Sequence, residues 1–246
     1  MKVQSYFILY LILAVLNYGL LEFLETKAFE QDFFSYETAF EDFRDGNMTD
    51  EIMQNYMDHA EQMGKEKRES FEKIAGWFRA MWSDAKRFPV GKIENAPGAK
   101  VRFANSWKES RTFGGDRFHE GCDIMASVNE RGIYPIYSVS DGVVEKIGWL
   151  NLGGYRIGIR SQGGAYFYYA HLSEYAEDFE PGEEISAGTL LGFMGDTGYS
   201  DIEGTTGNFP VHLHFGIYFT DEKEGEFSVN PYPLLFDLYQ KEQQLD

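Results

Sequence analysis

Four of the five histidines in this chain lie in three short strings, and one of these strings also carries an aspartate. The strings are FHEGCD (118–123), YYAHLS (168–173) and VHLHF (211–215). Together they supply His119, Asp123, His171, His212 and His214. Neutral imidazoles and a carboxylate are the usual protein ligands of zinc. The strings therefore indicate a metal site assembled from distant parts of the chain.

The VHLHF string has the pattern of a strand with one polar face. Side chains alternate across a sheet, so His212 and His214 are expected to point one way. Val211, Leu213 and Phe215 would then point into the core. Burying two imidazoles on such a strand costs several kcal/mol unless each finds a partner. A purely structural explanation would have to satisfy these rings without a metal.

The same alternation makes predictions for the other two strings. His119 and Asp123, four residues apart, share one face if their segment is extended. His171 is expected on the face that also carries Phe167 and Tyr169. Each string is weak evidence by itself, because a histidine beside aromatic residues is commonly a hydrogen-bonded core residue. The conjunction of the three strings in one region carries the prediction.

Composition excludes several classes of function. The chain has 246 residues, of which 43% are hydrophobic and 17% aromatic, which is enough to bury a substantial core. Its formal net charge of -18 argues against a nucleic-acid partner, since such surfaces need clustered Lys and Arg. The single cysteine, Cys122, excludes an internal disulfide.

The first 25 residues have the features of a membrane-directed segment. Residues 3–21 carry no charge, which is close to the length that spans a bilayer. Lys2 precedes this run, and Glu22 and Glu25 follow it, which places the rest of the chain outside the cytoplasm. We expect an uncleaved signal anchor over residues 1–25, a single-pass membrane helix. The alternative is a cleaved signal peptide and a secreted protein.

Residues 26–90 are acidic and have the periodicity of helices. Apolar residues recur at helical spacing at Ile52, Tyr56, Ala60 and Met63, and again from Phe71 to Trp82. A helix is predicted to begin near Asn47 and to cover residues 49–86, a reach of about 55 Å, with a break or bend at Gly64 or Gly76. We interpret this region as a helical stalk or a hairpin that packs on the neighbouring domain; the alternative is a coiled segment that binds a protein partner or an autoinhibitory flap.

The sequence pattern typical of β-structure begins after Pro89. Short β-branched or aromatic runs cover residues 143–149, 155–160 and 165–171. Glycine-containing loops at 151–154 and 161–164 separate them. Residues 91–246 are therefore predicted to form a mainly β domain, a compact antiparallel sheet or sandwich.

These motifs resemble those of the lysostaphin/LytM-like zinc endopeptidases. The likeness rests on FHEGCDIMA (118–126), AHL (170–172), PGEEISAGTLLGFMGDTG (181–198) and GNFPVHLHF (207–215), and it extends over residues 95–232. It implies an antiparallel β-fold with an open groove that cleaves the stem peptides or peptide bridges of bacterial peptidoglycan. It further implies that His119, Asp123 and His214 are zinc ligands, with His171 and His212 as catalytic histidines.

The residue types fit that chemistry. Two imidazoles and one carboxylate leave zinc a fourth position for water, as in catalytic sites. The chain has no H-E-x-x-H motif and so lacks the glutamate base of that protease class. His171 and His212 are the remaining candidates for moving protons. Glu120 is adjacent to His119, but strand alternation is expected to turn it away from the metal.

Three functional hypotheses follow. The first is a membrane-anchored zinc endopeptidase that acts on the peptides of peptidoglycan. The second is a zinc-binding regulator or scaffold of cell-wall remodelling without enzymatic activity, which the long acidic helical region would suit. The third is a cysteine protease built on Cys122, which the neighbouring Asp123 opposes because a negative charge raises a thiol pKa.

Overall fold

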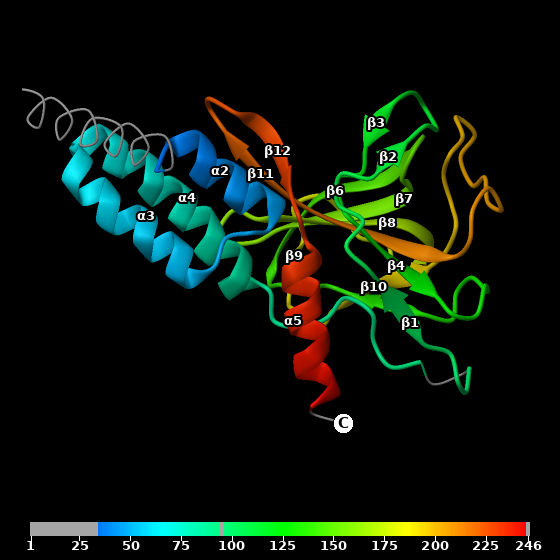
Figure 1. The fold of residues 1–246 in the computed structure, drawn as a ribbon. Helices are drawn as coiled ribbons and strands as arrows, with labels where there is room; N and C mark the ends of the chain where they lie inside the picture. The colour runs from blue at the N-terminus through cyan, green and yellow to red at the C-terminus, as the bar shows by residue number, and fades with distance from the viewer. Residues whose placement is uncertain (1–33, 94–95, 245–246) are drawn as a thin grey trace, which may run out of the picture. The chain divides into compact units, whose positions relative to one another are not determined.

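The chain forms two compact units. A computed structural model describes residues 34–93 and 96–244 (Figure 1). The first unit contains residues up to 41 and residues 49–72, and the second contains residues 42–48 and 73–246. The signal anchor expected at residues 1–25 lies outside the described residues. Within the described residues, no helix is both long enough and apolar enough to cross a membrane.

Three helices follow one another in the N-terminal part: α2 (Tyr36–Asp45), α3 (Asp50–Met63) and α4 (Lys65–Asp84). The cap of α3 is Thr49, whose Oγ1 accepts a hydrogen bond of 3.2 Å from the amide of Ile52, so the predicted start near Asn47 is two residues early. Gly64, at φ 99°, separates α3 from α4, whereas Gly76 lies within α4. The run predicted over residues 49–86 is therefore broken at the first of its two glycines.

Aromatic and small side chains form the core of the first unit. Tyr56 and Ala60, two positions of the predicted apolar stripe on α3, are 2% and 0% exposed. The ring of Tyr56 lies 5.6 Å from that of Phe71 between centroids. The helical periodicity of the sequence therefore identified part of this core.

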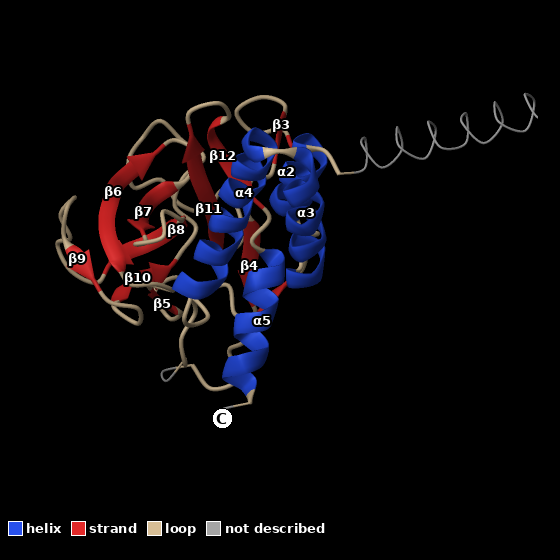
Figure 2. Ribbon diagram, turned by 90° about the vertical axis from the view of Figure 1, so that its left-hand side faces the viewer, coloured by secondary structure: helices blue, strands red, loops and turns tan. Residues whose placement is uncertain are grey.

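The second unit is built on a ten-stranded antiparallel sheet, as predicted for the mainly β region. Its main path runs β1-β4-β11-β8-β7-β6-β9, with β12 paired to β11 and β10 paired to β8 and β5. A separate two-stranded hairpin and a C-terminal helix complete the unit (Figure 2). The elements are β1 (Val101–Phe103), β2 (Ser110–Arg111), β3 (Arg117–Phe118), β4 (Cys122–Ala126), β5 (Pro135–Tyr137), β6 (Gly142–Leu150), β7 (Gly154–Arg160), β8 (Tyr166–Tyr175), β9 (Glu184–Ile185), β10 (Leu190–Met194), β11 (His212–Asp221), β12 (Gly225–Val229) and α5 (Tyr232–Gln243).

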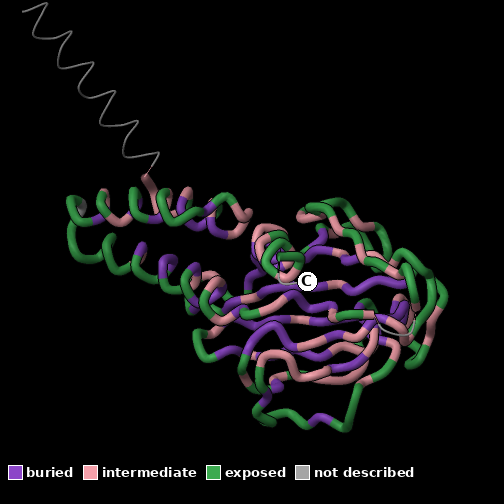
Figure 3. Tube along the Cα trace, turned by 90° about the horizontal axis from the view of Figure 1, so that it is seen from below, coloured by how far each residue is buried: buried purple, intermediate pink, exposed green. Residues whose placement is uncertain are grey.

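One face of this sheet is the apolar core. On β11, Leu213, Phe215 and Ile217 are fully buried, and on β8 Phe167 and Tyr169 are fully buried as well. Figure 3 shows the buried segments of the chain in purple. Strand alternation then leaves the opposite face of β8 and β11 for polar and aromatic side chains, and this face carries the candidate site.

Helical residues of the second unit cover the far end of β11. The ring of Trp77 on α4 lies 5.0 Å from Phe227 and 6.2 Å from Phe219 between centroids. Phe43 near the end of α2 also contacts Phe219, at 5.7 Å. These aromatic contacts fix the end of the β11–β12 hairpin that lies away from the histidines.

Candidate metal centre

Three neighbouring strands bring the histidine strings together. In the antiparallel register, His214 of β11 lies opposite Asp123 of β4 on one side and Ala170 of β8 on the other. His119 sits in the short connection between β3 and β4, and His171 follows Ala170. Segments that are almost 100 residues apart in the sequence, 95 between His119 and His214, therefore meet on one face of the sheet.

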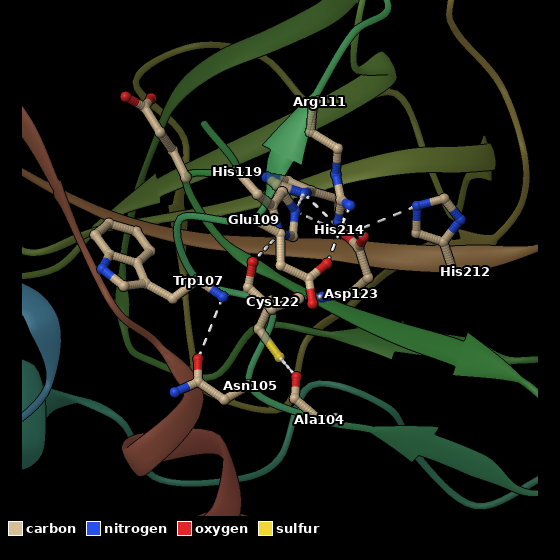
Figure 4. A network of polar contacts seen from close by, with 12 residues as sticks. Ala104, Asn105, Trp107, Glu109, Arg111, His119, Cys122, Asp123, His212 and His214 are labelled. Atoms are coloured by element: carbon tan, nitrogen blue, oxygen red, sulfur yellow. Dashed lines mark hydrogen bonds and ion pairs between the residues drawn. The ribbon is translucent and has the colours of Figure 1, made fainter. Parts of the chain in front are cut away.

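His119, Asp123 and His214 direct one atom each toward the same small volume. Nε2 of His119 lies 3.0 Å from Oδ1 of Asp123, and Nδ1 of His214 lies 3.1 Å from the same oxygen (Figure 4). The two ring nitrogens are 2.9 Å apart. The three ligand atoms all lie within 4.8 Å of one another, and the group has the geometry to hold a metal ion.

The hydrogen bonds of the site orient the ligand atoms of this group toward the position of a cation. Nδ1 of His119 lies 2.9 Å from the carbonyl oxygen of Ser106, which assigns the proton to Nδ1 and leaves a lone pair on Nε2. That lone pair faces Nδ1 of His214 and the carboxylate of Asp123. Two imidazole nitrogens and one carboxylate oxygen form a donor set that zinc accepts.

The carboxylate is held in its charged form. Burial opposes ionisation of Asp123, but its polar contacts with the rings of His119 and His214 outweigh it and hold the pKa of the carboxyl well below its usual range. Arg111 of the β2–β3 hairpin adds a contact of 2.9 Å from Nη2 to Oδ2 of Asp123. Nothing in the sequence pattern singled out Arg111, because the hairpin that brings it to the site is a tertiary feature.

His171 and His212 lie beside this group, and the Nδ1 atom of each ring contacts a backbone carbonyl. Nδ1 of His171 is 2.8 Å from the carbonyl oxygen of Thr197, and Nδ1 of His212 is 2.8 Å from that of Pro210. With Nδ1 donating, Nε2 of each ring is the unprotonated nitrogen. Nε2 of His212 lies 3.8 Å from Oδ1 of Asp123. The ring centroids of His171 and His212 are 4.7 Å apart.

Electrostatics keeps His171 neutral. Burial is the main cause that lowers its pKa well below the ordinary value, and the neighbouring His212 and His214 act in the same direction. Burial likewise lowers the pKa of His214. Neutral imidazoles are the form required both of a metal ligand and of a proton acceptor.

The position of His171 corrects the prediction made from strand alternation. Phe167 and Tyr169 point into the core, where Oη of Tyr169 accepts a hydrogen bond of 2.8 Å from the amide of Val139. His171 instead faces the other histidines. Its backbone has φ 64°, a left-handed conformation that costs a non-glycine residue about 1–3 kcal/mol and reverses the alternation at this point.

The path between His119 and Asp123 also differs from the extended segment that was assumed. β3 ends at Phe118 and β4 begins at Cys122, so a turn, not strand alternation, brings the two side chains together. Gly121 lies in this turn. A Cβ atom at this position would stand 2.7 Å from Nε2 of His214, so the site needs a glycine there.

The turn is held by the loop that precedes β2. The amide of His119 donates to the carbonyl of Glu109 at 2.9 Å, and the amide of Lys108 donates to the carbonyl of His119 at 2.9 Å. Asp45, the last residue of α2, binds Nζ of Lys108 at 2.6 Å and Nε1 of Trp107 at 3.2 Å. These contacts connect a helical residue of the second unit to the loop that orients His119.

Cys122 and Glu120 do not belong to the site chemistry. Sγ of the buried Cys122 donates to the carbonyl of Ala104 at 3.3 Å, and burial, reinforced by Asp123, raises the pKa of the thiol to about 12. A thiol in this state is not a nucleophile, which removes the basis of the cysteine-protease hypothesis. Glu120 is exposed at the rim of the site.

An aromatic wall next to His171 was not anticipated from the sequence. Phe113 stacks on Tyr199 with centroids 4.3 Å apart, and Tyr199 contacts Phe209 at 4.7 Å. Phe209 lies 4.6 Å from the ring of His171 and 5.1 Å from that of His212. The signal that could have revealed this wall is the presence of aromatic residues in glycine-rich loops that flank the histidine strings.

The metal group and the two further histidines open into one groove with a volume of about 590 Å³. Tyrosines, basic residues and apolar residues line it together with the site. The lining residues are Arg111, Arg117, Phe118, His119, Glu120, Asp123, Lys146, Leu150, Leu152, Gly153, Arg156, Tyr166, Tyr168, His171, Tyr199, His212, His214, Tyr218 and Glu226. A groove of this size accommodates several residues of an extended chain.

Comparison with known proteins assigns this fold and site to a family. Residues 117–231 match Peptidase family M23, and the chain belongs to this family. It is similar to the crystal structure of a LytM-type glycyl-glycine endopeptidase candidate from Ruminococcus gnavus, with 41% identity and a TM-score of 0.61 over 79% of this chain and 88% of that one. The resemblance inferred from the motifs is therefore confirmed.

Two curated relatives are similar to part of this chain. The L-Ala–D-Glu endopeptidase of Bacillus subtilis (strain 168) is 42% identical over 133 residues, which is 54% of this chain and 39% of the relative. The glycyl-glycine endopeptidase ALE-1 of Staphylococcus capitis is 33% identical over 99 residues, which is 39% of this chain and 24% of the relative. The chain thus spans less than half the length of either curated relative.

Proposed function

We propose that this protein is a zinc-dependent endopeptidase that hydrolyses a peptide bond in bacterial peptidoglycan. The observation that carries the proposal is the convergence of five side chains on one groove: two imidazoles and a carboxylate within reach of one cation, and two further histidines beside them. The names of the two curated relatives support both a stem peptide and a glycine bridge as the substrate.

In this proposal His119, Asp123 and His214 hold the zinc ion. Zinc bound there would supply a Lewis acid that activates water and polarises the scissile carbonyl. Asp123 remains anionic because of its hydrogen bonds, and Arg111 fixes the orientation of its second oxygen. Ser106 holds the ring of His119 so that Nε2 faces the cation position.

His171 and His212 would accept and donate the protons of the reaction. Each ring is fixed through Nδ1 by a backbone carbonyl, so Nε2 is available to accept a proton from the attacking water or to return one to the leaving amine. The depressed pKa of His171 keeps its Nε2 unprotonated at neutral pH. The aromatic wall of Tyr199 and Phe209 limits the access of bulk water to these rings.

Two expectations about the setting of this site belong to the same proposal. The uncharged run at residues 3–21 supports an anchor in the cell membrane, with the groove on the extracytoplasmic side, or a secreted protein if the run is cleaved. Residues 26–90 would then act as a stalk or as a surface for a protein partner.

Digestion of purified peptidoglycan by the zinc-loaded full chain tests the proposal. New amino termini should appear in the mass spectrum of the released fragments, and a zinc chelator should prevent their appearance. A chain that binds zinc but releases no fragments would overturn the proposal and favour the non-enzymatic regulator.

A further inference from the structure

The groove carries a buried cation that the chemistry described above does not use. Arg156 of β7 lines the groove, and its Nε and Nη1 atoms are buried. Among the residues that the structure describes, no hydrogen-bond acceptor reaches either of these atoms. A buried guanidinium without an anion is costly, so a site of this kind calls for an anionic partner from outside the chain.

The other basic residues of the groove already have partners. The four basic residues that line it are Arg111, Arg117, Lys146 and Arg156. Arg111 binds Asp123, Lys146 lies 3.6 Å from Glu226, and Arg117 donates to the hydroxyl of Tyr199 at 3.3 Å. Arg156 is therefore the basic residue of the groove whose buried nitrogen atoms have no hydrogen-bond partner among the described residues.

Nearby groups do not neutralise Arg156. Glu145, on the adjacent strand, is occupied by a two-pronged contact with Arg160, at 2.5 and 2.9 Å. Burial raises the pKa of Tyr166 to about 12 and raises that of Tyr168 further still, so both phenols near Arg156 stay protonated at neutral pH. Protonated phenols can donate hydrogen bonds to the same anion that the guanidinium attracts.

The strand register relates Arg156 to the metal group. β8 lies between β7 and β11, with Ala170 opposite His214 on one side and Tyr169 opposite Ile157 on the other. Arg156 is therefore two strands from His214, a distance of about 10 Å at ordinary strand spacing. An extended peptide covers that distance in about three residues, so the anion would lie within about three residues of the scissile bond.

We propose that Arg156 forms a subsite for a substrate carboxylate, so that the groove takes an acidic stem peptide in preference to a glycine bridge. This inference rests on the proposed peptidase function and specifies its substrate class. A glycine bridge offers no carboxylate within the chain, and its binding would leave the guanidinium unpaired. A D-glutamyl residue joined through its side-chain carboxyl keeps a free main-chain carboxylate, which lies within three residues of either neighbouring peptide bond.

A matched pair of peptides isolates this contact. The first is N-acetyl-L-Ala-D-Glu-L-Lys with the D-Glu joined through its side-chain carboxyl, and the second has a carboxamide in place of the free carboxylate. We expect the zinc-loaded full chain to favour the first by about 10–100-fold in kcat/KM, because only the first pairs with the guanidinium. Pentaglycine should be a poorer substrate than the first peptide by at least the same factor.

Variants assign the preference to one side chain. Arg156→Gln should abolish the discrimination while leaving the zinc content unchanged, and Arg156→Lys should retain part of it because it retains the charge. Arg102→Gln is the control, since Arg102 is an exposed arginine on β1 of the same sheet and does not line the groove. Its discrimination should equal that of the wild type.

Binding measurements by calorimetry separate this inference from the proposed function. Tighter binding of the carboxylate peptide without cleavage of any peptide would uphold the subsite and overturn the peptidase. Equal kcat/KM and equal Kd for the two peptides with the wild type, or a preference that survives in Arg156→Gln, would overturn the subsite. The wild-type comparison decides the question even if Arg156→Gln fails to fold.

Discussion

Nε2 of His119 and Nδ1 of His214 lie 2.9 Å apart, although the two histidines are 95 positions apart in the sequence. The proton of His119 is committed to the carbonyl of Ser106, so the two nitrogens share one site beside the carboxylate of Asp123. Three of the five predicted residues, His119, Asp123 and His214, thus form a group that could hold a cation, while His171 and His212 lie beside it, and each set has its own experimental signature.

Substitution of the two histidines of the H-x-H pair should separate metal binding from catalysis. His214→Ala removes one of three ligand atoms, so purified protein should contain far less zinc by elemental mass spectrometry. His212→Ala should retain the metal and lose roughly 10²–10⁴-fold in the rate of peptidoglycan hydrolysis. Full hydrolytic activity in His212→Ala would exclude it from the proton-transfer role.

Gly121→Ala should weaken the metal site without replacing any of its three ligands. The added Cβ would stand 2.7 Å from Nε2 of His214 and force that ring to move. We expect the affinity for zinc to fall about 10–100-fold, the size of effect seen when ligand orientation is disturbed. Competition with a fluorescent zinc chelator measures it.

Gly76→Ala is the control for that substitution. Gly76 lies within α4, and a Cβ there has no atom within 4 Å. The control should leave zinc affinity unchanged and raise stability by about 0.5–1 kcal/mol, since alanine is the better helix former. Equal affinity in both variants would show that the turn at Gly121 does not set the position of His214.

Zinc should stabilise the folded chain as well as activate it. A ligand that binds only the folded state at 100 times its Kd adds about 2.7 kcal/mol to the free energy of unfolding. We therefore expect a higher Tm on addition of zinc and a lower Tm after chelation. His214→Ala should show neither shift, and a zinc-induced shift of wild-type size in this variant would place the metal elsewhere.

The contact between Lys73 and Asp221 should make stability depend on acid. The side chain of Asp221 is 1% exposed; burial opposes its ionisation, but hydrogen bonds from Lys73 and from the amides of Glu224 and Lys223 lower its pKa to about 2. Because the folded pKa lies below the unfolded value of 3.8, this stabilisation is complete above pH 3.8 and disappears as the pH falls through about 2.

Urea unfolding of wild type and Asp221→Asn between pH 7 and pH 2 measures that contribution. We expect the variant to be less stable by about 1–2 kcal/mol at neutral pH, with the difference shrinking below pH 4. A difference that stays constant down to pH 2 would mean that the charge of Asp221 contributes nothing and that only its shape matters.

The sequence predicted the β-rich region and the set of five site residues because both depend on local signals. Alternation along residues 211–215 correctly placed His212 and His214 on the face opposite Leu213 and Phe215. Glycine-rich loops correctly marked the ends of β6, β7 and β8. These features are set by side-chain chemistry within a few residues.

Other features of the site depend on tertiary structure and could not be predicted in this way. The left-handed conformation of His171 exists because the carbonyl of Thr197 and the neighbouring aromatic rings hold the side chain on the unexpected face. Arg111 reaches Asp123 through a hairpin that is separate from the main sheet. The role proposed for Arg156 rests on the absence of a hydrogen-bond partner for its Nε and Nη1 atoms among the described residues, and no sequence pattern records this absence.

The separation of the ligands along the chain has a consequence for the timing of activity. His119 and Asp123 precede β8, and His214 follows it, so the metal group exists only when β11 has paired with β4, and His171 joins it only when β8 has paired with β11. Before β4 and β11 pair, the chain offers at most two adjacent donors, His119 with Asp123 or His212 with His214. Any hydrolytic activity would therefore begin only after both pairings have formed, and the chain would be inactive while it is being synthesised.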